Sequence, residues 1–265
     1  MGKGISEIIT PSALASTPAD SLQVYDTDGN ILIALDDELF PSLLSQACQQ
    51  LAPSSPLIIN ELGAGTGRCT IKLLSPTLPP IARINALDFS PGMLSLAQSR
   101  CEAEAALHRR AGNRVPEVSF YEFDALRPEE YPQVAPLFHT ADLVISALVM
   151  EHLPLAEFFQ AAKRLLKPGG CLLVTNMHAE MGRRGQAGFV DEETGEKIRG
   201  LSYVHDVADV LEDAGRNGFV LDGTVRVRGV EPSDVGEGRI LGPRGQKWLG
   251  SLCWFGCLMR LEERE

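Results

Sequence analysis

Leu57-Ile58-Ile59-Asn60-Glu61-Leu62-Gly63-Ala64-Gly65-Thr66-Gly67-Arg68 is the stretch of sequence that decides the fold. Its first half is a short apolar run, typical of a strand buried on both faces of a parallel sheet. The glycines that follow allow backbone to lie against a ligand, because they carry no Cβ atom. Dinucleotide-binding loops read G-x-G-x-x-G and would place a glycine where this chain has Arg68. The spacing therefore indicates a ligand loop that is not a standard pyrophosphate cradle.

The alternation of strand, loop and helix continues along the chain. Ser90 is suited to cap a helix that begins with Pro91. Apolar residues at i, i+3, i+4 and i+7 predict an amphipathic helix over 155–166, and the turn at 167–170 should stop it. We predict strands at 57–62, 84–89, 118–123, 141–148, 171–177, 219–230 and 247–261, and further helices near 36–51 and 204–214.

Strands that alternate with helices predict a parallel sheet covered on both faces. We therefore expect an α/β fold, a Rossmann-like, seven-stranded, mostly parallel sheet with helices on both faces. No helical pattern separates the last two strands, so these should form an antiparallel hairpin at the sheet edge.

Composition excludes several classes of function. The 265 residues carry 24 Lys and Arg against 35 Asp and Glu, a formal net charge of −11. Nucleic-acid binding needs a basic surface, so we expect no nucleic-acid partner. No run reaches the roughly 18 apolar residues of a membrane span, and we expect a cytoplasmic protein without stable membrane association. The cysteines show neither a C-x-x-C pair nor zinc-ligand spacing, so they should be structural thiols.

The motif E-x-G-x-G-x-G over 61–67 resembles that of the class I S-adenosylmethionine (SAM)-dependent methyltransferases, in which this loop wraps the methionine part of the cofactor. The resemblance implies S-adenosyl-L-methionine as cofactor. Asp88, which ends the second strand, would accept hydrogen bonds from both ribose hydroxyls. Asp124 would bind the adenine amino group, and Phe89 and Met93 would flank the ring. The cofactor-binding residues implied are Tyr25, Glu61, Gly63, Ala64, Gly65, Thr66, Gly67, Arg68, Asp88, Phe89, Met93, Asp124, Ala125, Ser146 and Ala147.

Two subclasses of this family do not match the chain. The N/D-P-P-Y/F motif of base amino-methyltransferases is replaced by Ser146-Ala147-Leu148-Val149. The metal-binding acids of the catechol-type branch are replaced by Ser146 and Asn176, so we expect no catalytic metal. The chain is more similar to the ubiquinone/menaquinone-type methyltransferases and their small-molecule relatives, and its 177–203 stretch resembles fungal biosynthetic-cluster methyltransferases.

We predict a single methyltransferase domain over 1–265. It comprises an N-terminal cap (1–56), a cofactor-binding core (57–177), an insertion or lid (178–203), and a C-terminal helix and hairpin (204–265). The insertion contains a turn-rich stretch suited to a hairpin. Residues 1–35 and 178–203 should cover the substrate, with Met150, Met181, Phe189 and Tyr203 lining its pocket.

Three histidines are candidates for a general base, since a neutral imidazole is the usual proton acceptor near pH 7. His152 follows the fourth strand, His178 the fifth, and His205 opens the next helix, so all three should lie on the ligand-binding rim. Each could instead hydrogen-bond to backbone, and an acceptor that is already nucleophilic needs no base.

The sequence thus predicts SN2 methyl transfer to a small molecule without a metal. Two alternatives stay open, a non-catalytic or regulatory relative and a SAM-fold enzyme of other chemistry such as cyclisation. Each acid could equally be a helix cap or a solvated loop end, and the glycine loop could be structural. The methyl acceptor and the oligomeric state are not determined by these patterns.

Overall fold

The computed structural model describes residues 8–9, 29–51, 55–185, 188–190, 197–200 and 202–263, with backbone alone for 8–9, 188–190 and 197–200. Tyr25 lies outside these residues. Within them, no helix is both long and apolar enough to cross a membrane. All six cysteines are buried free thiols.

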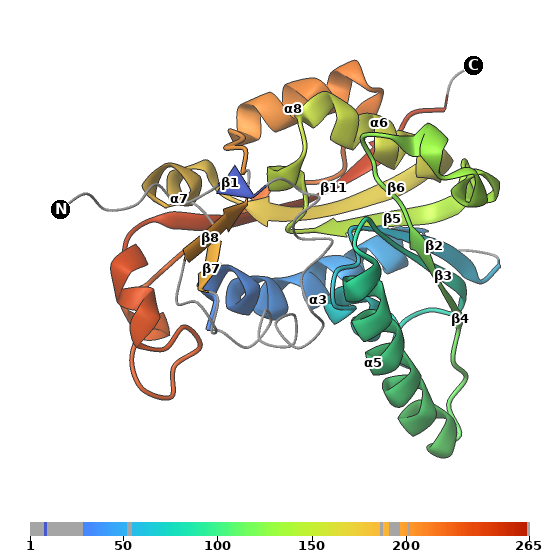
Figure 1. Ribbon diagram of the computed structural model, residues 1–265, viewed down its shortest axis with the longest axis horizontal. Coiled ribbons are helices and arrows are strands. Elements are labelled where there is room, and N and C mark those ends of the chain that lie inside the picture. Colours follow the sequence, from blue (N-terminus) through green and yellow to red (C-terminus); the bar gives the residue numbers. More distant parts are fainter. Residues whose placement is uncertain are drawn as a thin grey trace.

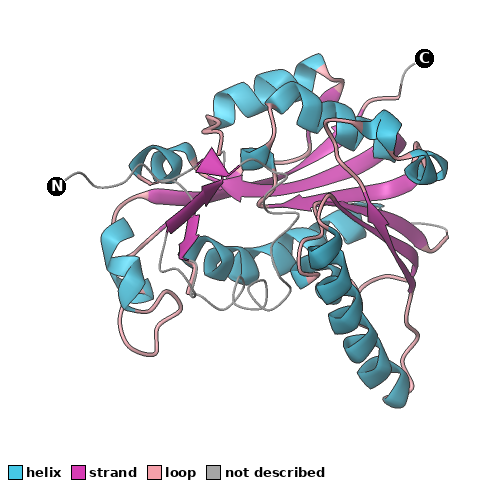
Figure 2. Cartoon of the chain, viewed as in Figure 1, coloured by secondary structure: helices cyan, strands magenta, loops and turns pink. Residues whose placement is uncertain are grey.

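A central sheet forms the middle layer of the molecule (Figures 1 and 2). Its order is β10-β11-β6-β5-β2-β3-β4, and β9 also pairs with β11. The five strands from β6 to β4 are parallel, and β11 is antiparallel to its neighbours. The strands are β2 (Leu57–Leu62), β3 (Ile81–Asp88), β4 (Glu117–Glu122), β5 (Ala141–Ala147), β6 (Leu166–Met177), β9 (Phe219–Leu221), β10 (Arg226–Gly229) and β11 (Leu252–Leu261).

Strand order reverses at β2. The chain runs outward from β2 to β3 and β4, then returns to place β5 on the other side of β2. Open α/β sheets bind ligands beyond the carboxyl ends of the strands at such a switch point. The glycine loop follows β2 and therefore lies at that position.

Helices cover both faces of the sheet, as predicted (Figure 1). On one face α3 (Ile31–Leu51), α4 (Arg68–Lys72) and α5 (Pro91–Arg110) contribute to one hydrophobic cluster, and α7 (Ala179–Arg184), which follows β6, adds Met181 to it. On the other, α6 (Leu155–Leu165) and α8 (Val207–Arg216) contribute to a second. Ser90 caps α5 by accepting a hydrogen bond from Met93 N at 3.4 Å, and Pro91 is the first helical residue. The predicted cap is confirmed.

The four largest departures from the predicted boundaries have identifiable causes. Helix α3 begins at Ile31 because Asn30 Oδ1 accepts a hydrogen bond from Leu32 N and the added turn is apolar and buried. Strand β6 begins at Leu166. Its register against β5 shifts between Leu166 and Cys171, so the Pro-Gly-Gly residues between them lie within an irregular part of the strand. The predicted 219–230 strand is split into β9 and β10 around Gly223, whose φ is +93°, so the central sheet has eight strands instead of seven. Residues 243–248 form a 3₁₀ turn, so the last strand begins at Leu252.

The insertion contains the predicted hairpin. Strand β7 (Gly188–Val190) pairs antiparallel with β8 (Lys197–Gly200). Strand β1 (Ile8–Ile9) pairs parallel with β8, so the N-terminal segment joins the insertion in a separate three-stranded sheet. The antiparallel edge formed by β9, β10 and β11 also matches the prediction.

Asp36 links three segments that are far apart in the sequence. Its carboxylate is fully buried in α3, accepts a hydrogen bond from Trp254 Nε1 at 2.8 Å, and pairs with Arg68 at 2.7 Å. Arg68 also reaches Asp37, at 2.8 Å. The first helix is thereby attached to the last strand and to the start of α4.

Asp36→Ala should destabilise the fold by about 3–5 kcal/mol, because it leaves the Trp254 indole N–H without its acceptor and removes the buried partner of Arg68, whose remaining carboxylate, Asp37, is partly exposed. The lower part of that range is expected, since the Arg68 side chain is 15% exposed. Urea unfolding measures the effect. Asp37→Ala is the matched control: its side chain is 44% exposed, and the loss should stay below about 1 kcal/mol. Equal effects would contradict the central role of Asp36.

Candidate cofactor and acceptor site

The three glycines of the glycine loop have two different roles. All have positive φ, at +78° for Gly63, +53° for Gly65 and +81° for Gly67. A Cβ on Gly63 would lie 2.3 Å from Val149 Cγ2, and one on Gly67 would lie 2.9 Å from Ala97 Cα in α5. A Cβ on Gly65 would meet no atom within 4 Å. The outer glycines are therefore required by close packing, whereas Gly65 borders open space.

Asp88 joins the two ligand loops, which are the glycine loop after β2 and the turn between β3 and α5. Gly65 N donates to Oδ2 at 2.8 Å, and Ser90 N donates to Oδ1 at 2.9 Å. Burial raises the pKa of this carboxyl, and these backbone donors oppose that shift. Each carboxylate oxygen has a second lone pair, so Asp88 can still accept hydrogen bonds from a ligand.

Beneath the loop lies a second buried acid, Glu61. Burial raises the pKa of Glu61 to about 8, although the Thr70 hydroxyl donates to its Oε2 and opposes the shift. Arg68, expected near the cofactor carboxylate, is paired with Asp36 and Asp37. Thr66 and Ala64 are buried in the loop itself.

The expected adenine side is formed by α5 and the turn after β4. Phe89 is half-buried and Met93 is buried. Asp124 Oδ1 accepts a hydrogen bond from Leu126 N at 2.9 Å, and its Oδ2 pairs with Arg127 at 3.0 Å. Asp124 thus has local partners already, and Ala125 beside it is half-buried.

The end of β5 and the turn that follows it (residues 146–152), here called the β5 rim, contain backbone strain. Leu148 has φ +59°, a left-handed conformation that costs an L-residue about 1–2 kcal/mol. Ser146 Oγ donates to Leu62 O at 2.9 Å and joins β5 to β2, and Ala147 is half-buried. After Leu148 the chain places Val149 against Gly63. Strain of this kind is typical of functional sites.

The three candidate histidines have different surroundings. His178 caps α7, where its Nδ1 accepts from Glu180 N at 3.2 Å. His205 Nε2 faces the carbonyls of Met150 and Leu153 at 3.2 and 3.0 Å, which makes it a donor. His152 lies on the turn η3 (Met150–His152), its side chain is 39% exposed, and its Nε2 is 3.8 Å from Glu151 Oε1.

The expected pocket residues do not share one lining. Met150 and Met181 are buried in separate hydrophobic clusters. Tyr203 is half-buried, stacks on His205 at 5.7 Å between ring centroids, and donates its backbone N–H to Glu151 O at 2.6 Å. Phe189 lies in β7, whose backbone alone is described.

Two residues at this rim were missed from the sequence. Val149 packs on the glycine loop, and Glu151 is a carboxyl with a 5% exposed side chain whose Oε2 has no hydrogen-bond partner. The only signal for Glu151 was its place beside His152, just after a buried strand.

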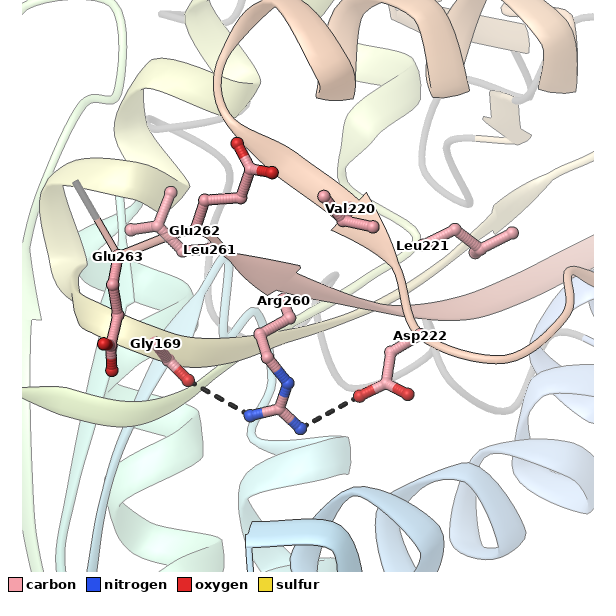
Figure 3. Close-up of a pocket in the computed structure, with 8 residues that line it drawn as sticks. All are labelled: Gly169, Val220, Leu221, Asp222, Arg260, Leu261, Glu262 and Glu263. Atoms are coloured by element: carbon pink, nitrogen blue, oxygen red, sulfur yellow. Dashed lines mark hydrogen bonds and ion pairs between the residues drawn. The ribbon is translucent and has the colours of Figure 1, made fainter. Parts of the chain in front are cut away.

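A cavity of about 480 Å³ lies elsewhere (Figure 3). It is bordered by Gly169, near the start of β6, and by the end of β11, so it lies at the amino end of the parallel strands. Arg260 inside it is already bonded to Gly169 O at 3.1 Å and to Asp222 at 2.9 Å. The cavity therefore lies at the opposite end of the parallel strands from the glycine loop, and its arginine is already paired within the protein.

Comparison with known proteins decides the family. A family model described as a methyltransferase domain matches residues 60–172. A protein of Emericella nidulans named an uncharacterized methyltransferase is 42% identical over 250 residues, which cover 88% of this chain and 86% of that protein. The chain belongs to the SAM-dependent methyltransferase family.

Solved structures share the fold of this methyltransferase. SAM-dependent methyltransferases from Methanosarcina mazei and Mesorhizobium loti match with TM-scores of 0.54 and 0.52 at 14% and 18% identity. These matches cover 80% and 81% of this chain and 95% and 96% of those chains. The cyclase SpnF also matches, with a TM-score of 0.53 and 15% identity over 84% of this chain and 81% of its own.

SAM is the cofactor of this methyltransferase family, and the geometry fits it. The open space at Gly65 leaves room for a ligand against the loop backbone, and Asp88 offers acceptor lone pairs beside that space. Of the residues that the structure describes, no group of three or more His, Cys, Asp or Glu side chains is arranged to hold a metal ion.

Asp88→Ala should weaken SAM binding by about 1.5–3 kcal/mol, the range for hydrogen bonds to a charged group, or about 10–150-fold in Kd. Asp124→Ala should weaken it less, because its expected partner is a neutral amine. Isothermal titration calorimetry with SAM measures both. Circular dichroism of each variant should show that the fold is intact. A larger effect for Asp124 would reverse the assignment.

Proposed function

We propose that this protein transfers a methyl group from SAM to a small-molecule acceptor without a catalytic metal. The observation that supports this most directly is the joining of Gly65 and Ser90 through one carboxyl, Asp88, at the switch point of the sheet. This unit is suited to hold the cofactor, and the strained β5 rim beside it contacts the loop through Val149.

When bound, the cofactor supplies a methyl group already activated on its sulfonium. The protein then has to position the acceptor, which can lower the barrier by roughly 7–11 kcal/mol. His152 accepts the proton of the acceptor. His152 lies close enough to Glu151 and Asp88 for its charge to oppose the rise that burial causes in the pKa of both carboxyls.

His152→Ala should lower kcat by about 10²-fold or more, the usual contribution of a general base, and leave the affinity for SAM nearly unchanged. Turnover is followed as the 14-unit mass gain of the acceptor, with candidate metabolites screened first. His108→Ala is the control, because His108 pairs with Glu104 on α5 and should not affect turnover.

Normal turnover in His152→Ala, His178→Ala and His205→Ala alike would show that proximity suffices. A product without the mass gain would favour other SAM-fold chemistry, a possibility raised by the likeness to the cyclase SpnF. No binding of SAM at all would favour a non-catalytic relative.

We further propose that residues 1–35 and 178–203 form a cover over the acceptor. The parallel pairing of β1 with β8 supports a joint role for these two segments. Tyr203 N bonds to Glu151 O and brings the end of the insertion to the β5 rim.

Amide hydrogen exchange tests this cover. SAM together with an acceptor should slow exchange in 1–35 and 178–203, because closing the site excludes water from their backbone. SAM alone should protect mainly 63–124. Protection confined to 63–124 with both ligands present would contradict the cover.

A further inference from the structure

Four buried side-chain polar atoms in the described part of the chain have no hydrogen-bond partner. They are Glu151 Oε2, Thr175 Oγ1, Ser202 Oγ and Asn85 Oδ1. Buried polar groups are nearly always paired, so each exception calls for an explanation.

Three of the four belong to one rim. Glu151 lies in η3, directly after β5. Thr175 lies near the end of β6, opposite Ala147, the last residue of β5. Ser202 precedes Tyr203, whose N–H donates to Glu151 O at 2.6 Å. The three segments that carry these groups thus meet at the end of β5, through the pairing of Thr175 with Ala147 and the hydrogen bond from Tyr203 N to Glu151 O.

Glu151 is the most costly of the three to bury. Burial raises its pKa, while the charge of His152 and the Met177 amide favour the ionised form. Asp234 provides a contrast: it is also buried, yet Arg228 and Glu231 N bond to its two oxygens at 2.7 and 2.8 Å. Asp234 thus has a hydrogen-bond partner for each carboxylate oxygen, whereas Oε2 of Glu151 has none.

We propose that Glu151, with the hydroxyls of Thr175 and Ser202, recognises an amino group of the methyl acceptor. An ammonium carries a positive charge and three N–H donors, which suits one carboxylate and two hydroxyl oxygens. A charged hydrogen bond would recover the cost of burying the acid. This assignment rests on the proposed methyl transfer and gives its acceptor a chemical class, while His152 keeps the role of base.

The acceptor reaches Oε2 by displacing the end of the insertion. Tyr203 N and His205 Nε2 hold that segment on the η3 turn through hydrogen bonds to carbonyls. Polar contacts of this kind can be exchanged for contacts with a ligand at small net cost, since each contributes little net free energy.

Isothermal titration calorimetry tests whether Glu151 recognises an amino group. The protein is first saturated with S-adenosylhomocysteine. The probes are primary amines, each paired with the alcohol of the same carbon skeleton. The amines should bind at least tenfold more tightly than the alcohols, and Glu151→Gln should weaken amine binding by about 10–150-fold. Asp234→Asn, the matched buried acid, should bind them as the wild type does.

Equal binding of amines and alcohols, no amine binding, or unchanged amine binding in Glu151→Gln would overturn the assignment. Methyl transfer is scored separately on the same panel. An amine that binds through Glu151 without gaining a methyl group contradicts the proposed function and leaves the recognition role standing.

Thermal unfolding at pH 8 tests the role of Glu151 without any acceptor. Because the folded pKa is raised, the folded state resists ionisation of Glu151 at this pH while the unfolded chain ionises freely. Glu151→Gln should therefore raise Tm by about 2–4 °C, and Glu151→Met provides a second variant. Asp234→Asn should lower Tm. A fall in Tm for both Glu151 variants would show a structural acid and overturn the assignment.

Discussion

The carboxylate of Asp88 is the constraint on which the candidate cofactor site depends. It receives the N–H of Gly65 from the loop after β2 and the N–H of Ser90 from the cap of α5. The positions of the loop, the helix start and the carboxylate are consequently set together. Gly67, close to the backbone of Ala97 in α5, allows this approach because a Cβ would not fit. Contacts within the protein therefore fix the conformation of the glycine loop.

On the opposite side of β2, the β5 rim concentrates features that reduce stability. Leu148 adopts a left-handed backbone, and Glu151 is buried with an unpaired oxygen. Ser146, bonded to Leu62 O, and Val149, packed on Gly63, keep this rim in register with the glycine loop. Strain and unpaired polarity at one place, supported by well-packed neighbours, are what a site organised for ligand chemistry is expected to show.

The segments outside the parallel core attach to it at a few defined points. Asp36 connects α3 with Trp254 in the last strand and with Arg68 at the start of α4. Tyr203 and His205 attach the end of the insertion to the η3 turn. Both attachments lie next to the ligand loops, so the accessory segments can respond to what the site binds.

The sequence alone determined the α/β architecture, the strand at 57–62, the glycine loop and the cap at Ser90, because these depend on local periodicity and local hydrogen bonds. It also placed acids at the strand ends. Tertiary structure alone decided that Arg68 pairs with Asp36, that His205 donates to backbone carbonyls, and that Tyr203 N bonds to the carbonyl of the buried Glu151. These contacts join residues dozens of positions apart, and only the packed sheet brings such residues together and excludes water from them.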